Sequence, residues 1–178
     1  MASLDESLSQ ALRDLRSGSP EARRVAHLQL VTAASEQRVI HALVQALDDT
    51  SWTFRSRLAQ VLGDVGEEAA KELKMAVAHG VWYVRAAAAE ALAAIEGEGA
   101  IEFLLPLLTD RAVGVRRAAI AGLVGNLTVE RVPEFAEALQ SLDAETRDPL
   151  LHALRKEREE LYLEILNRRD ADSGRHVQ

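Results

Sequence analysis

Apolar residues recur along this chain with the spacing of an α-helix. Counted from Arg85, the positions at −1, +3, +7 and +10 are Val84, Ala88, Leu92 and Ile95. The same positions around Arg55 are Phe54, Leu58, Leu62 and Val65. On a helix of about 3.6 residues per turn these positions share one face. Because no segment sustains an alternation of apolar and polar residues, we expect helices and no strands.

The apolar segments are grouped in pairs, with turn-forming residues between the two members. We expect first helices over residues 4–15, 36–47, 67–78, 100–108 and 132–142. Second helices are expected to begin near Pro20, Trp52, Trp82, Val113 and Glu145. Separating segments such as Ser17-Gly18-Ser19-Pro20 contain residues that favour turns and helix caps. The chain is therefore predicted to form five helical hairpins.

An arginine marks the start of the second helix in every pair. These arginines are Arg23, Arg55, Arg85, Arg116 and Arg147, and successive ones are 32, 30, 31 and 31 residues apart. A period this regular indicates structural repeats. A lone hairpin cannot bury its apolar face, whereas stacked hairpins share a continuous core.

The period also predicts the domain organisation. We expect a single repeat domain over residues 1–167, with repeats at about 1–34, 35–66, 67–96, 97–127 and 128–167. Residues 168–178 are polar and charged, so a disordered tail is expected there.

The arginine motif resembles that of a known superfamily. Its pattern is [Val/Phe]-Arg-x-x-Ala-Ala-x-x-Leu, with an aspartate six residues before the arginine at Asp49 and Asp110. This combination resembles the HEAT repeats and is most similar to the phycobilisome-lyase-type HEAT-like repeats. The resemblance implies an all-α fold: a right-handed α-solenoid of about five antiparallel hairpins, an armadillo-type superhelix.

The resemblance also implies a role for the repeat arginines. In that family the aspartate of one repeat bonds the arginine of a neighbour. A structural ladder is therefore expected from Arg23, Arg55, Arg85, Arg116 and Arg147 with Asp49 and Asp110. The ladder is incomplete, because the matching positions elsewhere are Ser17, His79 and Ser141.

Charge and composition narrow the function classes. The formal net charge of −7 argues against broad binding to a phosphate backbone. The absence of cysteine excludes disulfides and thiolate metal sites. The first residues lack the layout of a signal peptide, and no apolar run approaches the roughly 20 residues that span a bilayer. A cytoplasmic protein without membrane contact is expected.

The outward face of the second helices is the main candidate site. In HEAT solenoids these helices line the concave surface, and positions +1 and +5 from each arginine point away from the core. The partner-binding face is therefore predicted to comprise Arg24, Leu28, Ser56, Gln60, Ala86, Glu90, Arg117, Ala121, Asp148 and His152. A low-relief surface of this kind suits an extended peptide or a helix of a partner protein.

Aromatic residues offer a second kind of contact. Trp52 and Trp82 each lie three residues before a repeat arginine. They are candidate anchors for a partner, but packing against the next repeat is the favoured interpretation. Tyr83 is expected to be more exposed and is the better anchor candidate.

The last apolar stretch differs from the repeats. Leu161, Tyr162 and Ile165 cover more than one helix face. We expect a C-terminal cap that folds back on the last repeat, and a contact between subunits or with a partner is the alternative. The oligomeric state is not predicted.

Catalytic motifs are missing from the sequence. The HEAT-like hydroxylases hold iron with His-Glu pairs, and none of the five histidines is followed by glutamate. No His-x-x-x-His spacing, nucleophile elbow or phosphate loop is present. We therefore expect neither a cofactor nor a metal.

Three functions remain. The first is a non-catalytic scaffold or adaptor that binds a protein segment. The alternative, carried by the resemblance, is a bilin lyase-like or chromophore-handling subunit. Nucleic-acid binding is a third hypothesis that the net charge disfavours.

Overall fold

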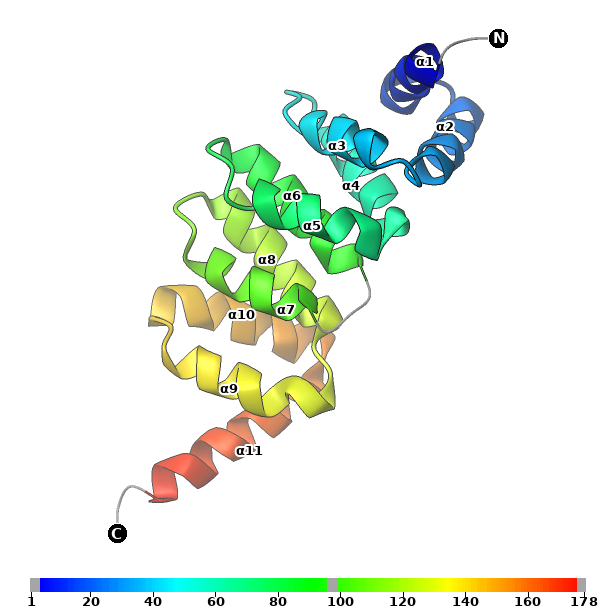
Figure 1. Cartoon of the computed structure of the whole chain (residues 1–178). Helices are drawn as coiled ribbons and strands as arrows, with labels where there is room; N and C mark the ends of the chain where they lie inside the picture. Colours follow the sequence, from blue (N-terminus) through cyan, green and yellow to red (C-terminus); the bar gives the residue numbers. More distant parts are fainter. Residues whose placement is uncertain (1–3, 96–98, 176–178) are drawn as a thin grey trace. The chain divides into compact units, whose positions relative to one another are not determined.

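The computed structural model describes residues 4–95 and 99–175 of the chain (Figure 1). Within these ranges the regular structure is helical throughout, with no strand. This confirms the all-α fold class. The chain forms two compact units, residues 1–96 and 97–178. The single domain expected over residues 1–167 stays a prediction.

The first unit consists of three helical hairpins. Its helices are α1 (Leu4–Ser17), α2 (Pro20–Ala33), α3 (Gln37–Gln45), α4 (Trp52–Val65), α5 (Glu67–Ala76) and α6 (Trp82–Ala94). The second helices stack in the order α2, α4, α6, and α3 packs on α5. The second helices begin at the residues that the sequence predicts.

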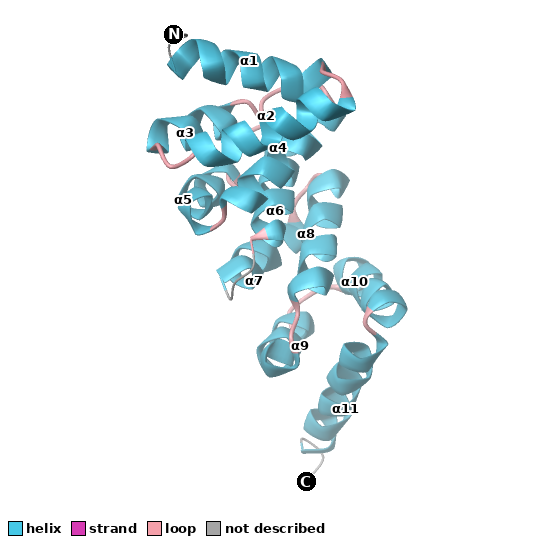
Figure 2. Cartoon of the chain, turned by 90° about the vertical axis from the view of Figure 1, so that its right-hand side faces the viewer, coloured by secondary structure: helices cyan, strands magenta, loops and turns pink. Residues whose placement is uncertain are grey.

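The second unit contains two further hairpins and a final helix. Its elements are α7 (Gly99–Leu104), η1 (Leu105–Thr109), α8 (Val113–Asn126), η2 (Val129–Arg131), α9 (Val132–Gln140), α10 (Ala144–Glu157) and α11 (Glu159–Arg175). The helix expected over residues 100–108 changes to a 3-10 helix at Leu105, next to Pro106, which has no amide hydrogen to donate. Helix α8 packs on α10 (Figure 2).

Local signals at the helix ends explain several of these boundaries. The hydroxyl of Ser19 accepts a hydrogen bond from the amide of Ala22, and Pro20 occupies the first helical turn. Ser51 caps α4 in the same way. Between α4 and α5, Gly66 has a φ of 77°, a conformation that glycine adopts without steric cost. A single residue therefore separates these two helices.

The core of the first unit is formed by the predicted apolar faces. Leu58, Leu62 and Ala88 are fully buried. Small residues allow α4 and α6 to approach closely: a Cβ atom placed on Gly63 would lie 2.6 Å from the Cβ of Ala94. Alanine and glycine in these helices therefore set the distance between successive repeats.

The C-terminal segment requires two corrections. Helix α11 packs on α9 and α10 and buries Leu161 and Ile165, so these residues are not available for a partner contact. Tyr162 is half-buried. The tail expected from residue 168 is helical through Arg175, whereas residues 176–178 lie outside the described part of the chain. Among the described residues, no helix is long and apolar enough to cross a membrane.

Candidate functional site

The repeat arginines bind the carbonyl groups of the turns within their own hairpins. Arg23 Nη1 donates to the carbonyl of Gly18 at 2.6 Å, and Arg55 Nη1 donates to that of Asp49 at 2.5 Å. Arg85 and Arg116 make the equivalent bonds at 2.8 and 2.9 Å. The arginine side chain thus closes the turn between the two helices of a repeat.

The fifth arginine departs from this pattern. Arg147 forms an ion pair with its neighbour Asp148, with 3.4 Å between Nε and Oδ1. It makes no hydrogen bond to a turn carbonyl among the described residues. Four of the five repeat arginines therefore share a bond to a turn carbonyl of their own hairpin, and Arg147 does not.

The position of the two motif aspartates, six residues before their arginines, reflects the shape of the turn. Asp49 Oδ1 accepts a hydrogen bond from the amide of Ser51 at 2.7 Å, and Asp110 Oδ1 accepts one from Ala112 at 2.8 Å. Each aspartate thereby folds the turn whose carbonyl the arginine binds. The contact made by both repeat arginines is to the aspartate backbone.

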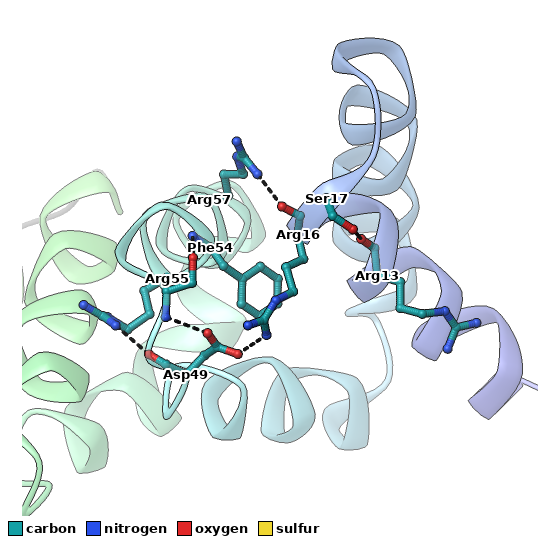
Figure 3. Close-up of polar contacts among 8 residues, drawn as sticks. Arg13, Arg16, Ser17, Asp49, Phe54, Arg55 and Arg57 are labelled. Carbon is teal, nitrogen blue, oxygen red and sulfur yellow. Dashed lines mark hydrogen bonds and ion pairs between the residues drawn. The ribbon is translucent and has the colours of Figure 1, made fainter.

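A different arginine binds the Asp49 carboxylate. Arg16, in the last turn of α1, forms an ion pair with Asp49 (Figure 3). Figure 3 shows the Asp49 side chain between Arg16 and Arg55. The expected ladder is therefore corrected at this position: the link between repeats runs through Arg16, which lies outside the repeated motif.

Aromatic rings extend this link across three repeats. The Arg16 guanidinium lies 5.3 Å from the centroid of the Phe54 ring, and that of Arg55 lies 4.5 Å from the Tyr83 ring. The Tyr83 hydroxyl donates to Asp48 Oδ1 at 3.0 Å. This bond, with partial burial, raises the pKa of Tyr83. Tyr83 is thus engaged in the structure and is not the most exposed anchor.

The two tryptophans are more exposed than the sequence analysis favours. Trp52 is 68% exposed and Trp82 is 49% exposed, so neither is packed away against the next repeat. The Trp82 ring meets Tyr83 edge to face, with centroids 5.8 Å apart. Because each tryptophan begins a second helix, both rings lie at the turn end of their hairpins.

The predicted binding face remains largely open in each unit. In the first unit Arg24, Leu28, Gln60 and Glu90 are exposed and Ser56 is half-buried. In the second unit Arg117, Ala121, Asp148 and His152 are exposed on α8 and α10. Ala86 is wrong as a contact residue, because it is only 9% exposed. We use the name second-helix face for the other five residues of the first unit.

Glu90 has an unusual environment on this face. Partial burial raises the pKa of its carboxyl group, and the charge of Arg55 opposes that effect. The carboxylate is therefore partly removed from water before any partner binds.

A pocket of about 450 Å³ opens on the second-helix face of the first unit. Helix α2 lines it with Arg23, Arg24, His27 and Leu28. Leu15 of α1 and two residues of α4, Arg57 and Gln60, complete the wall. Three of these residues, Arg24, Leu28 and Gln60, belong to the predicted binding face, and Arg23 belongs to the predicted structural ladder.

Long-range contacts explain why the rest of the pocket was missed. Arg57 Nη1 donates to the carbonyls of Leu15 and Arg16 at 3.0 and 2.8 Å, at the C-terminal end of α1. His27 Nε2 lies 2.7 Å from Asp64 Oδ2. These contacts join residues more than 30 positions apart, and no local motif signals them. Among the described residues, no group of histidine and carboxylate side chains is arranged to hold a metal ion.

Comparison with known proteins supports the fold. Residues 6–93 and 42–124 match the family model of HEAT repeats. A similar solved structure belongs to the complex of CpcE and CpcF of phycocyanin lyase from Nostoc sp. PCC7120. Its TM-score is 0.52 at 23% identity, and the alignment covers 83% of this chain and 97% of that chain.

A second similar structure is the crystal structure of an engineered protein, with a TM-score of 0.41 and 23% identity. That alignment covers 83% of this chain and 77% of the engineered one. No curated protein matches this chain.

Proposed function

This chain belongs to the HEAT-repeat family, and we propose that it is a non-catalytic scaffold that binds a segment of a partner protein on its second-helix face. Its all-α repeat solenoid fold is one that commonly serves protein–protein interaction. Stacked repeats bury one side of each second helix and leave the other side open. That open side is the surface on which the proposal rests.

The exposure of Leu28 is the observation that carries the proposal. Leu28 is 60% exposed in the middle of α2, and it lines the pocket on the second-helix face. A partner that covers this side chain would gain about 25 cal/mol for each Å² of apolar surface removed from water. Gln60 lines the same pocket, and the partly desolvated Glu90 adds a polar group to the second-helix face on α6.

The exposed tryptophans support a second contact of the same partner. Trp52 and Trp82 lie at equivalent positions of successive repeats, and tryptophan is enriched among residues that dominate binding energy. A partner segment that reaches the turn end of α4 and α6 would bury both rings.

The test is the capture of partners with tagged protein from the native cell, followed by mass spectrometry. Wild type is compared with the double variant Gln60→Arg/Glu90→Arg. We expect the variant to lose the captured protein while its circular dichroism spectrum stays helical, because both changes place bulky cations on exposed positions.

A matched variant controls for the change in charge. Glu137→Arg/Gln140→Arg introduces the same substitutions on exposed positions of α9, away from the second helices. This control should retain the partner. Capture that is equally strong with the wild type and the Gln60→Arg/Glu90→Arg variant contradicts binding on the second-helix face.

A further inference from the structure

Positive charge is concentrated at one point of the first unit. Three arginines, Arg23, Arg24 and Arg57, line the pocket of about 450 Å³. The chain as a whole has a formal net charge of −7, so this positive cluster has the opposite sign to the net charge. Among the described residues, the carboxylates paired with the pocket lining are Glu21, on Arg24, and Asp64, on His27.

Two of these arginines are held in place by the backbone. Arg23 donates from Nη1 to Gly18, and Arg57 donates from Nη1 to Leu15 and Arg16. A guanidinium has five N–H donors, so most donors of each side chain remain without a partner in the described part of the chain. Because these side chains are already ordered, binding a ligand costs them little conformational entropy.

The uncharged residues of the pocket lining indicate what the rest of the ligand must be. Leu15 and Leu28 both line the pocket, and Leu15 is buried whereas Leu28 is exposed. Gln60 adds a neutral polar group from α4. The lining therefore combines guanidinium donors with an aliphatic surface, and its size suits one or two side chains.

We propose that this pocket binds an acidic side chain of the partner protein, a glutamate or aspartate next to an aliphatic residue. This inference rests on the proposed function and names the chemistry that the partner must carry. Arginine matches a carboxylate with two parallel hydrogen bonds. The aliphatic neighbour covers Leu28. The overall negative charge of the chain opposes a nucleic acid, whose binding depends on neutralising many phosphates.

The experiment is a titration followed by NMR, with acetyl-Glu-Leu-Glu-amide as the probe. We expect the side-chain Nε–H signals of Arg23, Arg24 and Arg57 to shift on addition of this peptide. Acetyl-Gln-Leu-Gln-amide has the same shape without the charge and should leave them in place.

Two variants make the result specific. Arg24→Gln removes one cation whose contact is the exposed Glu21, and it should weaken peptide binding by about tenfold through the loss of a charge-assisted hydrogen bond. Arg38→Gln removes an exposed arginine of α3 that lies outside the pocket, and it should leave the affinity unchanged.

Three outcomes overturn the inference: no shift at millimolar peptide, equal shifts with the glutamine peptide, or tighter binding of inorganic phosphate than of the acidic peptide. Its failure is distinguishable from that of the proposed function. A partner that is lost by Gln60→Arg/Glu90→Arg but bound normally by Arg24→Gln leaves the scaffold role standing and removes the acidic pocket. If the acidic peptide binds at the arginines while partner capture is unaffected by Gln60→Arg/Glu90→Arg, the peptide-binding pocket stands and the proposed binding on the second-helix face is contradicted.

Discussion

The guanidinium carbon of Arg55 lies 4.5 Å from the centroid of the Tyr83 ring. The same side chain is buried and donates to the Asp49 carbonyl. Arg55 therefore connects the turn before α4 with the first turn of α6. One residue both closes its own repeat and supports the next.

We predict that Arg55→Ala lowers the free energy of unfolding by about 2–4 kcal/mol, because a charge-assisted hydrogen bond and a cation–π contact are lost together. Urea denaturation followed by circular dichroism measures the loss. Arg147→Ala is the matched change at an arginine without a turn bond, and it should cost about 1 kcal/mol or less. Equal losses for the two variants contradict the special role of Arg55.

The bond between Tyr83 and Asp48 predicts an effect of alkaline pH. The pKa of Tyr83 is raised chiefly by this bond, so the folded state favours the protonated hydroxyl. The resulting stabilisation is present below the ordinary tyrosine pKa of about 10 and is lost as the pH rises through the folded-state pKa. In a Tyr162→Phe background, ultraviolet titration should show Tyr83 ionising above the ordinary range. Asp48→Ala should lower the pKa of Tyr83 toward the ordinary tyrosine value, and an unchanged titration contradicts the bond.

The close approach of α4 and α6 predicts that Gly63 tolerates no side chain. In Gly63→Ala the new methyl would meet the Cβ of Ala94 at 2.6 Å. Overpacking of this kind costs about 1–3 kcal/mol, against a gain of up to about 1 kcal/mol in helix propensity. A lower thermal midpoint is expected, with recovery in Gly63→Ala/Ala94→Gly. Gly125→Ala, which has open space around it, should be neutral or stabilising.

The environment of Glu90 predicts a stability change in the opposite pH range. Partial burial raises the pKa of Glu90, so the charged carboxylate is less favourable in the folded state than in the unfolded state. Stability from this group therefore increases as the pH falls through the folded-state pKa toward the ordinary value. Glu90→Gln should be slightly more stable than wild type at neutral pH. It should not show the increase in stability that Glu90 contributes as the pH falls. Urea midpoints at neutral and mildly acidic pH measure both effects.

Arg158 is predicted to stabilise the end of α8. Its Nη1 donates to the carbonyls of Val124 and Gly125, and its Nη2 donates to that of Leu127, at 3.1, 3.4 and 3.1 Å. A cation at a helix C-terminus binds carbonyls that have no partner within the helix. Arg158→Ala should lower the stability of the second unit by about 2–3 kcal/mol. Hydrogen exchange should then quicken in α8 and α11, whereas Arg155→Ala, at an exposed position, should leave it unchanged.

Local patterns in the sequence were sufficient to predict the helical repeats and the starts of the second helices in the first unit. The apolar spacing, the regular arginines and the caps at Ser19 and Ser51 each act within one turn or one hairpin, so they are visible in a short window of residues. The same holds for the bonds that four of the five repeat arginines make to their own turns, because five or six positions separate donor and acceptor in each. The all-α repeat fold follows from such short-range rules.

The tertiary structure alone decided how residues of different repeats meet. The partner of the Asp49 carboxylate is Arg16, and the partner of Arg57 is the end of α1, because these pairings depend on the distance and rotation between stacked hairpins. Those quantities are set by core packing, such as the contact of Gly63 with Ala94, and leave no periodic trace. The exposure of Trp52 and the pocket of arginines also depend on tertiary packing, since both arise from the way neighbouring helices cover one another.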